Sequence, residues 1–303
     1  MNGVEQALIG GVDGGTAILI PALGELIGER SGVVNLGTEG CMLAGALAAF
    51  DAGTTTGSAW VGVLVGAAAG ASFGLLHAWM TVIRRADQLA SGLVVWFLAL
   101  GVTSVFGVSY INKSVVPLPT LAVPGLSRIP WAGPILFKHD ALVYLGYLLV
   151  ALVWVVLYRT RIGLTLRATG ERPEVVTATG GHPVRIQILA VTLGAALAGI
   201  GGAQLSVGYV DNWFNDMTSG YGFVAVAVVL FAAWRPAMVL LGAYLFGVAL
   251  ATASVVQAHG VAINQYLLDA LPYLVTLTAL VAVARRGSRQ APEGLRRALT
   301  HSV

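Results

Sequence analysis

The sequence is poor in charge. Only 10% of its 303 residues are Asp, Glu, Lys or Arg, whereas soluble domains have about 25%. Hydrophobic residues make up 57% of the chain, there are 39 glycines in addition, and the mean hydropathy is +0.82. So few polar side chains cannot cover a water-soluble protein of this size. The composition excludes an ordinary soluble enzyme, and it excludes a disordered protein because disordered chains are rich in charge and poor in aliphatic residues. The lipid bilayer is the expected solvent.

Cysteine and catalytic motifs are scarce as well. The single Cys41 excludes an intrachain disulfide, and the five histidines include no pair four residues apart, the spacing of a helical metal site. A near-match to a phosphate-binding loop in residues 107–114 has Asn112 where the motif needs a glycine before its lysine. We therefore expect no cofactor and no enzyme activity in this chain. Nucleic acid is not an expected partner, because the arginines are spaced between apolar runs.

Apolar segments of membrane-spanning length recur along the whole chain. A helix that crosses about 30 Å of hydrocarbon needs about 20 mostly apolar residues. Nine segments fit, at residues 8–27, 36–51, 57–82, 88–109, 140–158, 186–208, 220–233, 237–256 and 265–284. The second and seventh are short, so the number of crossings lies between eight and ten. The sequence predicts an all-α, polytopic membrane helix bundle in which residues 1–303 form one domain.

Two further patterns describe this bundle. Glycines recur every fourth residue from Gly62 to Gly74, which predicts a close contact with a neighbouring helix. Short cytoplasmic loops carry an excess of Lys and Arg, and arginines gather at residues 30, 84–85, 159–185, 235 and 285–297. On the opposite side only Lys113, Arg128 and Lys138 are basic. We therefore expect an outside N-terminus without a cleaved signal, a cytoplasmic basic tail over residues 285–303, and no sizeable domain outside the membrane.

Residues 24–40 place three glutamates and Arg30 among apolar residues. Glu39 lies four residues into the second span, and an ionisable group there indicates a functional site. Glycines at 28, 32, 37 and 40 around Asn35 predict an interrupted helix over residues 28–40, which is tolerated in a membrane only where it lines a cavity or is buried in protein. Arg30 is the expected partner of Glu39. Two roles stay open for Glu39, namely lining a pathway or capping a helix within the bundle.

The sizeable loop on the predicted cytoplasmic side spans about residues 159–185. It predicts two short helices, one ending at Gly170 and one running from Pro173 to Gly180, since proline favours the first turn of a helix and glycine its end. Such helices suit either a membrane surface or a docking site for a cytosolic partner.

Three blocks of sequence carry a family resemblance. Residues 24–40 closely resemble the signature of bacterial ABC-transporter permeases of the sugar, nucleoside and branched-chain amino acid importers, above all the nucleoside and simple-sugar branch. Residues 166–180 are similar to the coupling loop of that family, with departures at Arg172, Val175 and Val176. Residues 222–227, 234–236 and 246–247 resemble its late pattern. The blocks occur in order over most of the chain.

The resemblance implies a type II importer in the bacterial cytoplasmic membrane. In such an importer two permease chains enclose a pathway, cytosolic ATPases bind ATP and Mg²⁺, and an extracytoplasmic binding protein delivers a nucleoside or simple sugar. This chain would be one permease, shorter at its N-terminus than other relatives and paired with a different, longer permease. The implied coupling-loop residues are Arg167, Gly170, Glu171, Arg172, Pro173, Thr177 and Gly180. Candidate pathway residues are Asn35, Glu39 and Trp96, together with Asn212 and Trp213 in a loop expected to face the binding protein.

A secondary transporter driven by an ion gradient is the alternative. Glu39 and Asp269, both within apolar spans, would then be the ion-coupling sites. Residues 28–34 and 170–176 share five of seven residues, which is a faint internal repeat. Inverted repeats would not keep both copies on one side of the membrane, so the repeat gives this alternative little support.

Overall fold

The computed structural model describes residues 2–259 together with residues 274, 278 and 293. The long helices are α1 (Gly3–Arg30), α2 (Thr38–Thr56), α3 (Ala59–Ala78), α4 (Gln88–Gly107), α6 (Ala141–Arg159), α9 (Pro183–Ala203) and α11 (Pro236–Ala258). The shorter helices are α5 (Ala132–Leu136), α7 (Arg161–Glu171), α8 (Pro173–Ala178) and α10 (Tyr221–Phe231). The remaining elements are the helical turns η1 (Trp79–Ile83), η2 (Val108–Tyr110), η3 (Leu126–Arg128) and η4 (Gln204–Tyr209), and the strands β1 (Thr120–Ala122) and β2 (Lys138–Asp140).

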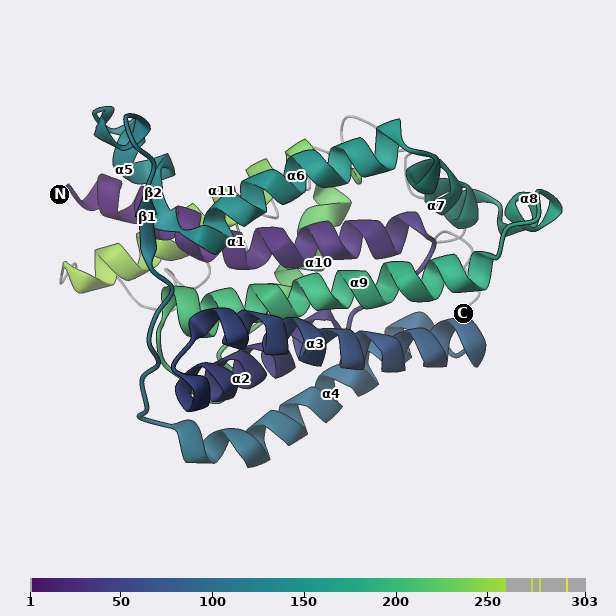
Figure 1. Cartoon of the computed structure of the whole chain (residues 1–303), viewed down its shortest axis with the longest axis horizontal. Coiled ribbons are helices and arrows are strands. Elements are labelled where there is room, and N and C mark those ends of the chain that lie inside the picture. The colour runs from purple at the N-terminus through teal and green to yellow at the C-terminus, as the bar shows by residue number, and fades with distance from the viewer. Residues whose placement is uncertain (1, 260–273, 275–277, 279–292, 294–303) are drawn as a thin grey trace.

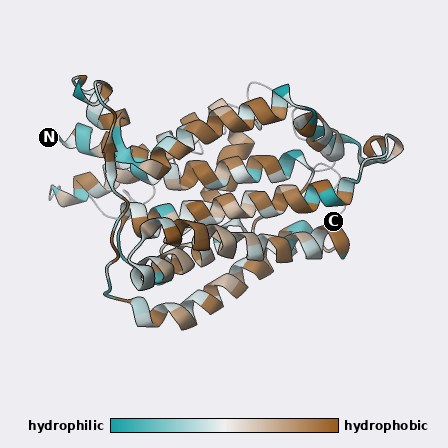
Figure 2. Ribbon diagram, in the orientation of Figure 1, coloured by the Kyte–Doolittle hydropathy of each residue, from teal (hydrophilic) through white to brown (hydrophobic). Residues whose placement is uncertain are grey.

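The helices form a bundle whose long axes run in roughly one direction (Figure 1). Helices α1 and α9 lie side by side in the centre, with α6 along one edge and α2, α3 and α4 along the other. Helix α11 packs along α1. The strands and α5 lie at one end of the bundle, called the hairpin end below, and α7 and α8 lie at the opposite end, called the α7 end. Apolar residues cover the helices, whereas polar residues are more frequent at the two ends (Figure 2).

Among the described residues, six helices are long and apolar enough to cross a membrane, and they correspond to six of the nine predicted spans: α1, α3, α4, α6, α9 and α11. The two short predicted spans correspond to α2, of 19 residues, and α10, of 11 residues. The ninth span at 265–284, which contains Asp269, and the basic tail over 285–303 lie outside the described residues. A bundle of membrane helices is therefore confirmed, and the count of nine stays a prediction.

The glycine stripe of α3 explains how closely the central helices pack. A Cβ atom on Gly62 would lie 2.5 Å from the carbonyl oxygen of Ala49, and one on Gly66 would lie 2.8 Å from that of Gly45. Farther along, Gly70 and Gly74 face α9 in the same way. Since a side chain at these positions would separate the helices, the stripe is a packing surface, as the spacing predicts.

Among the described residues the basic side chains are divided between the two ends of the bundle, as predicted. Arg30 Nη2 donates to the backbone oxygen of Trp234 (3.2 Å), which brings the end of α1 and the turn before α11, with Arg235, together at the α7 end. Lys113, Arg128 and Lys138 belong to the segment that forms the hairpin end. This segment adds to the all-α bundle a two-stranded antiparallel sheet in which Leu121 pairs with His139.

Candidate functional site

Glu39 lies where two helices begin inside the bundle. It stands in the first turn of α2, is 1% exposed, and faces the first turn of α10. Its carboxylate accepts hydrogen bonds from the Thr218 hydroxyl (2.6 Å), the Gly220 amide (2.9 Å) and the Gly222 amide (2.6 Å). Amides at a helix N-terminus have no partners within the helix, and the helix dipole favours a negative charge there. Glu39 therefore caps α10.

The capped helix is too short to cross a membrane. Its 11 residues span about 16 Å at ~1.5 Å per residue, roughly half of the hydrocarbon thickness. Gly222 allows the close contact with α2, since a Cβ atom there would lie 2.5 Å from the backbone nitrogen of Glu39. Helix α10 begins inside the bundle and is held there by a carboxylate. In this it resembles the discontinuous helices that form binding sites in transporters.

The turn between α1 and α2 is organised by a second buried carboxylate. Glu25 accepts hydrogen bonds from the Asn35 amide (2.7 Å) and the Thr38 hydroxyl (2.9 Å), and thereby holds the start of α2. Gln88 of α4 accepts from the Val34 amide (2.9 Å). The helical path therefore breaks between Arg30 and Thr38, as the glycines around Asn35 predict.

The predicted pairing of Arg30 with Glu39 is wrong. Arg30 Nη2 donates to Tyr158 and to the backbone of Trp234, while Glu39 receives its three hydrogen bonds from the start of α10. The reason is geometric, because Arg30 ends α1 at the α7 end whereas the chain turns back into the bundle before it reaches Glu39. Of the two roles left open for Glu39, capping is the one seen in the structure, and pathway lining stays a prediction.

Three of the five candidate pathway residues lie close together. Asn35 is 4% exposed, and its side-chain oxygen has no hydrogen-bond partner. Trp96 of α4 stacks on Phe97 (ring centroids 4.7 Å apart) and meets Phe223 of α10 edge-on (5.0 Å). The backbone of Trp96 touches Gly40, next to Glu39. The result is a polar and aromatic cluster around the start of α10.

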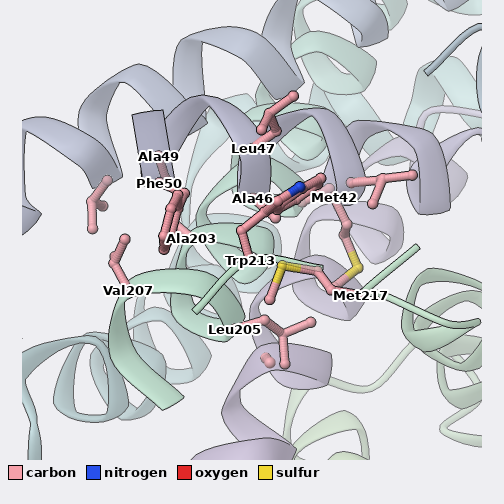
Figure 3. Close-up of a cluster of buried hydrophobic side chains, with 14 of the residues drawn as sticks. Met42, Ala46, Leu47, Ala49, Phe50, Ala203, Leu205, Val207, Trp213 and Met217 are labelled. Carbon is pink, nitrogen blue, oxygen red and sulfur yellow. The ribbon is translucent and has the colours of Figure 1, made fainter. Parts of the chain in front are cut away.

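The other two candidates lie apart from this cluster. Asn212 is exposed and pairs by its backbone with Ser114. Trp213 is 1% exposed and belongs to an apolar cluster with Met42 and Met217 (Figure 3). Gly107 leaves room for its indole, because a Cβ atom there would lie 2.5 Å from Trp213 Nε1. Trp213 is thus a core residue, and its exposed neighbour Phe214 is the aromatic residue that this loop presents.

The predicted coupling loop forms two short helices at the α7 end. The Thr160 hydroxyl caps α7 by accepting from the Gly163 amide (3.1 Å), and α7 ends at Glu171, one residue beyond the predicted end. Helix α8 begins at Pro173 and ends at Ala178, and Gly180 follows with φ +82°. Helix α8 projects beyond the bundle (Figure 1).

The two helices of this loop are anchored on the bundle from one side only. In α8, Val176 is 3% exposed and lies against Gly181, whereas Val175 is 50% exposed. In α7, the guanidinium of Arg167 lies over the Tyr158 ring, 5.3 Å from its centroid. The rest of the outer surface, which includes Glu171, Arg172 and Thr177, is exposed.

The coupling loop also touches the turn that holds α2. A Cβ atom on Gly170 would lie 3.0 Å from the backbone nitrogen of Gly32, so these two backbones are in direct contact. Gly32 has φ +92°, a conformation that glycine adopts without strain. Backbone contacts thus connect α7 with the turn that leads to Asn35 and Glu39.

Sequence reasoning missed a polar network at the hairpin end. His139 Nδ1 lies 2.6 Å from an Asp13 carboxylate oxygen, and Asp140 caps α6 while accepting from Gln204 (2.8 Å). Burial lowers the pKa of His139, but the hydrogen bond and charge of Asp13 outweigh it, so that the pKa lies above its usual value. Asp13, within the first apolar span, was the signal that could have identified this network.

Two arrangements typical of enzymes, a metal cluster and a nucleophile elbow, are not formed by the described residues. No group of three His, Cys, Asp or Glu side chains that could hold a metal ion occurs among them. The letters of a nucleophile elbow, G-x-S-x-G, do occur at Gly70 to Gly74, but this segment is continuous helix. Its Ser72 donates to the Ala68 carbonyl (2.9 Å) and is not displayed on a strand-to-helix turn.

Comparisons with known proteins agree with this arrangement. The family model described as "Branched-chain amino acid transport system / permease component" matches residues 9–281. The guanosine ABC transporter permease protein NupQ of Bacillus subtilis is 32% identical over 295 residues, or 92% of each chain. The nucleoside ABC transporter permease protein NupC of Lactococcus lactis is 34% identical over 281 residues, or 88% of each chain.

A further relative is the putative glucose ABC transporter permease protein TsgC13 of Haloferax volcanii. It is 40% identical over 240 residues, which cover 78% of this chain and 73% of the relative. No solved structure matches the chain.

Proposed function

We propose that this chain, which belongs to the family of branched-chain amino acid transport system permease components, moves a nucleoside or a simple sugar into the cell as one subunit of an ATP-driven ABC importer. The observation that carries the proposal is the family match over residues 9–281, together with relatives named as guanosine, nucleoside and glucose permeases. The chain is a multi-pass membrane protein and a translocation subunit, not an enzyme.

The surroundings of Glu39 support an uncharged solute. The carboxylates that hold the starts of α2 and α10 are engaged, Glu25 by the turn and Glu39 by α10, so neither is free to pair with a cationic solute. Trp96 and Phe223 offer aromatic surface, and Asn35 offers an unpartnered amide oxygen. Nucleosides and sugars are bound by aromatic faces and hydrogen bonds. The proposed pathway therefore runs past Asn35, Glu39 and Trp96. The loop that carries Asn212 and the buried Trp213 faces the binding protein through its exposed residues, Asn212 and Phe214.

The α7–α8 loop is the proposed docking site for the ATPase, which binds ATP and Mg²⁺. Helix α8 buries Val176 and exposes Val175, so a partner can bind its exposed face without unfolding the bundle. A push on α8 would reach the α1–α2 turn through Gly170 and Gly32. The turn, α2 and the capped α10 would then move between two packings, and the docked ATPase would bias that equilibrium.

The proposed orientation places the α7 end in the cytoplasm, with the N-terminus outside and the C-terminus inside. The excess of arginines at the α7 end supports it. The hairpin end then faces the extracytoplasmic binding protein. Permeases of this family associate with an ATPase and a binding protein, and we propose that the second permease is a different chain, with residues 1–303 acting as one domain. An ion-driven transporter is not favoured by the family match.

The experiment uses the chain co-expressed with its neighbouring transporter genes. The variant Val175→Asp places a charge on the exposed face of α8, and we expect the ATPase no longer to co-purify. Ile129→Asp, at a residue 42% exposed in the hairpin-end segment, is the matched control and should keep the ATPase. Uptake of labelled nucleoside or sugar should require ATP. Uptake that continues without any ATPase but stops when the proton gradient is collapsed would refute the proposal.

A further inference from the structure

The outer surface of the bundle contains a long apolar groove near the α7 end. It lies between α6 and α9, is closed at one end by α7, and has Ile27 of α1 at its floor. Its volume is about 640 Å³. Leucines of both walls face into it, among them Leu152, Leu189 and Leu193, and each is at least half exposed. Among its described lining residues there is no carboxylate.

Positive charge is found at one end of the groove. Arg161, the first residue of α7, is exposed and lines it. Arg185 is also exposed and precedes Leu189 by four residues on α9, so it lies on the same helix face one turn nearer the α7 end. No carboxylate of the described residues forms an ion pair with either arginine.

The helix that closes the groove has the character of a membrane-surface helix. Next to Arg161, Ile162 is 73% exposed, and Leu164 is 60% exposed. Short helices that combine exposed apolar and basic residues lie at the boundary between lipid head groups and acyl chains. Arg161 therefore stands at the depth of the lipid phosphates, with the apolar groove extending from it toward the membrane centre.

We propose that this groove binds a phospholipid with a negatively charged head group. One acyl chain occupies the groove between α6 and α9, and the phosphate is held by Arg161 and Arg185. Basic pockets between membrane helices bind anionic head groups in this way. An apolar helix of another protein would fill the groove but would leave both guanidinium groups without partners. The groove is separate from the Glu39 cluster. The proposal depends only on the location of the chain in a membrane and not on the solute that it transports.

The test measures which lipid stays bound to the full-length chain, purified in detergent with any co-purifying subunits. Phosphatidylglycerol or phosphatidylcholine is added, and the retained lipid is counted by native mass spectrometry. Ala196→Trp fills the groove from α9, and Val105→Trp, on a lipid-facing position of α4 that is 72% exposed, is its control. The paired variant Arg161→Gln with Arg185→Gln removes both charges.

We expect the native chain to retain phosphatidylglycerol in preference to phosphatidylcholine. Ala196→Trp should lose the bound lipid, whereas Val105→Trp should keep it. One arginine near a membrane surface changes lipid affinity about five-fold, so the paired arginine variant should lower the preference roughly 25-fold. Arg84→Gln with Arg85→Gln, which removes two exposed charges elsewhere, should leave it unchanged.

Three results would overturn the proposal. The first is equal retention of the two lipids by the native chain, and the second is equal lipid loss in both tryptophan variants. The third is release of a co-purifying membrane subunit by Ala196→Trp but not by Val105→Trp, which would make the groove a protein interface. Because both arginines are exposed, their substitution tests the site even if Ala196→Trp does not fold.

Discussion

Replacement of Glu39 tests the role of its carboxylate as the cap of α10. In Glu39→Ala the amides of Gly220 and Gly222 lose their acceptors inside the bundle. A buried donor without an acceptor costs about 1–3 kcal/mol, so the two amides together cost about 2–6 kcal/mol of the free energy of unfolding. Glu39→Gln keeps one acceptor oxygen but loses the charge, and we expect a smaller loss of about 1–3 kcal/mol.

The loss should also be local. The chain is titrated from mild detergent into dodecyl sulfate, and unfolding is followed by tryptophan fluorescence. We expect Glu39→Ala to unfold at a lower fraction of dodecyl sulfate than the native chain. Hydrogen exchange should show faster exchange of the amides over residues 220–224 than over the middle of α9. Glu174→Ala, which removes an exposed carboxylate on α8, is the control and should change neither measurement. If Glu39→Ala behaves as this control does, Glu39 is not a cap and the interpretation of the site is wrong.

Two further perturbations test the packing and the hairpin end. Gly70→Ala places a Cβ atom 2.8 Å from the Gly199 backbone. We expect it to lower the free energy of unfolding by about 1–3 kcal/mol. Gly101→Ala, where nothing lies within 4 Å, should be neutral or stabilise by up to about 1 kcal/mol; equal effects in the same titration would contradict the packing role. Because the pKa of His139 is raised in the folded chain, its pairing with Asp13 stabilises fully below the unfolded value of about 6.5 and is lost as pH rises through the folded value. Stability should therefore decline as the pH rises above about 6.5, and His139→Gln should flatten that decline. An unchanged pH profile would refute this interpretation.

Much of the fold was accessible from local sequence patterns. Stretches of apolar residues long enough to cross a bilayer predict helices because the backbone must satisfy its own hydrogen bonds in lipid. Local preferences also predicted the two helices of the coupling loop, because proline favours the first turn of a helix and glycine favours its end. The glycine spacing of α3 predicted a packing face, although it did not identify α2 and α9 as the partners.

The candidate site was predicted in part. The cost of a carboxylate within an apolar run drew attention to Glu39, which the structure shows buried at the start of α10, and Asn35 and Trp96 lie near it. The expected partner was wrong because Arg30 is nearer in sequence, whereas the true donors, Thr218, Gly220 and Gly222, are about 180 residues away. Sequence distance carries no information about which helix ends meet in a bundle.

The sequence by itself determined the solvent, the helical segments and the segregation of basic residues, because each follows from the properties of neighbouring residues. Only the tertiary structure decided which polar groups are paired. Three contacts join segments that are distant in sequence: the hydrogen bonds from α10 to Glu39, the backbone contact of Gly170 with Gly32, and the pairing of Asp13 with His139. In lipid a buried polar group must find a partner within the protein, and the packing of the helices settles which partner is within reach.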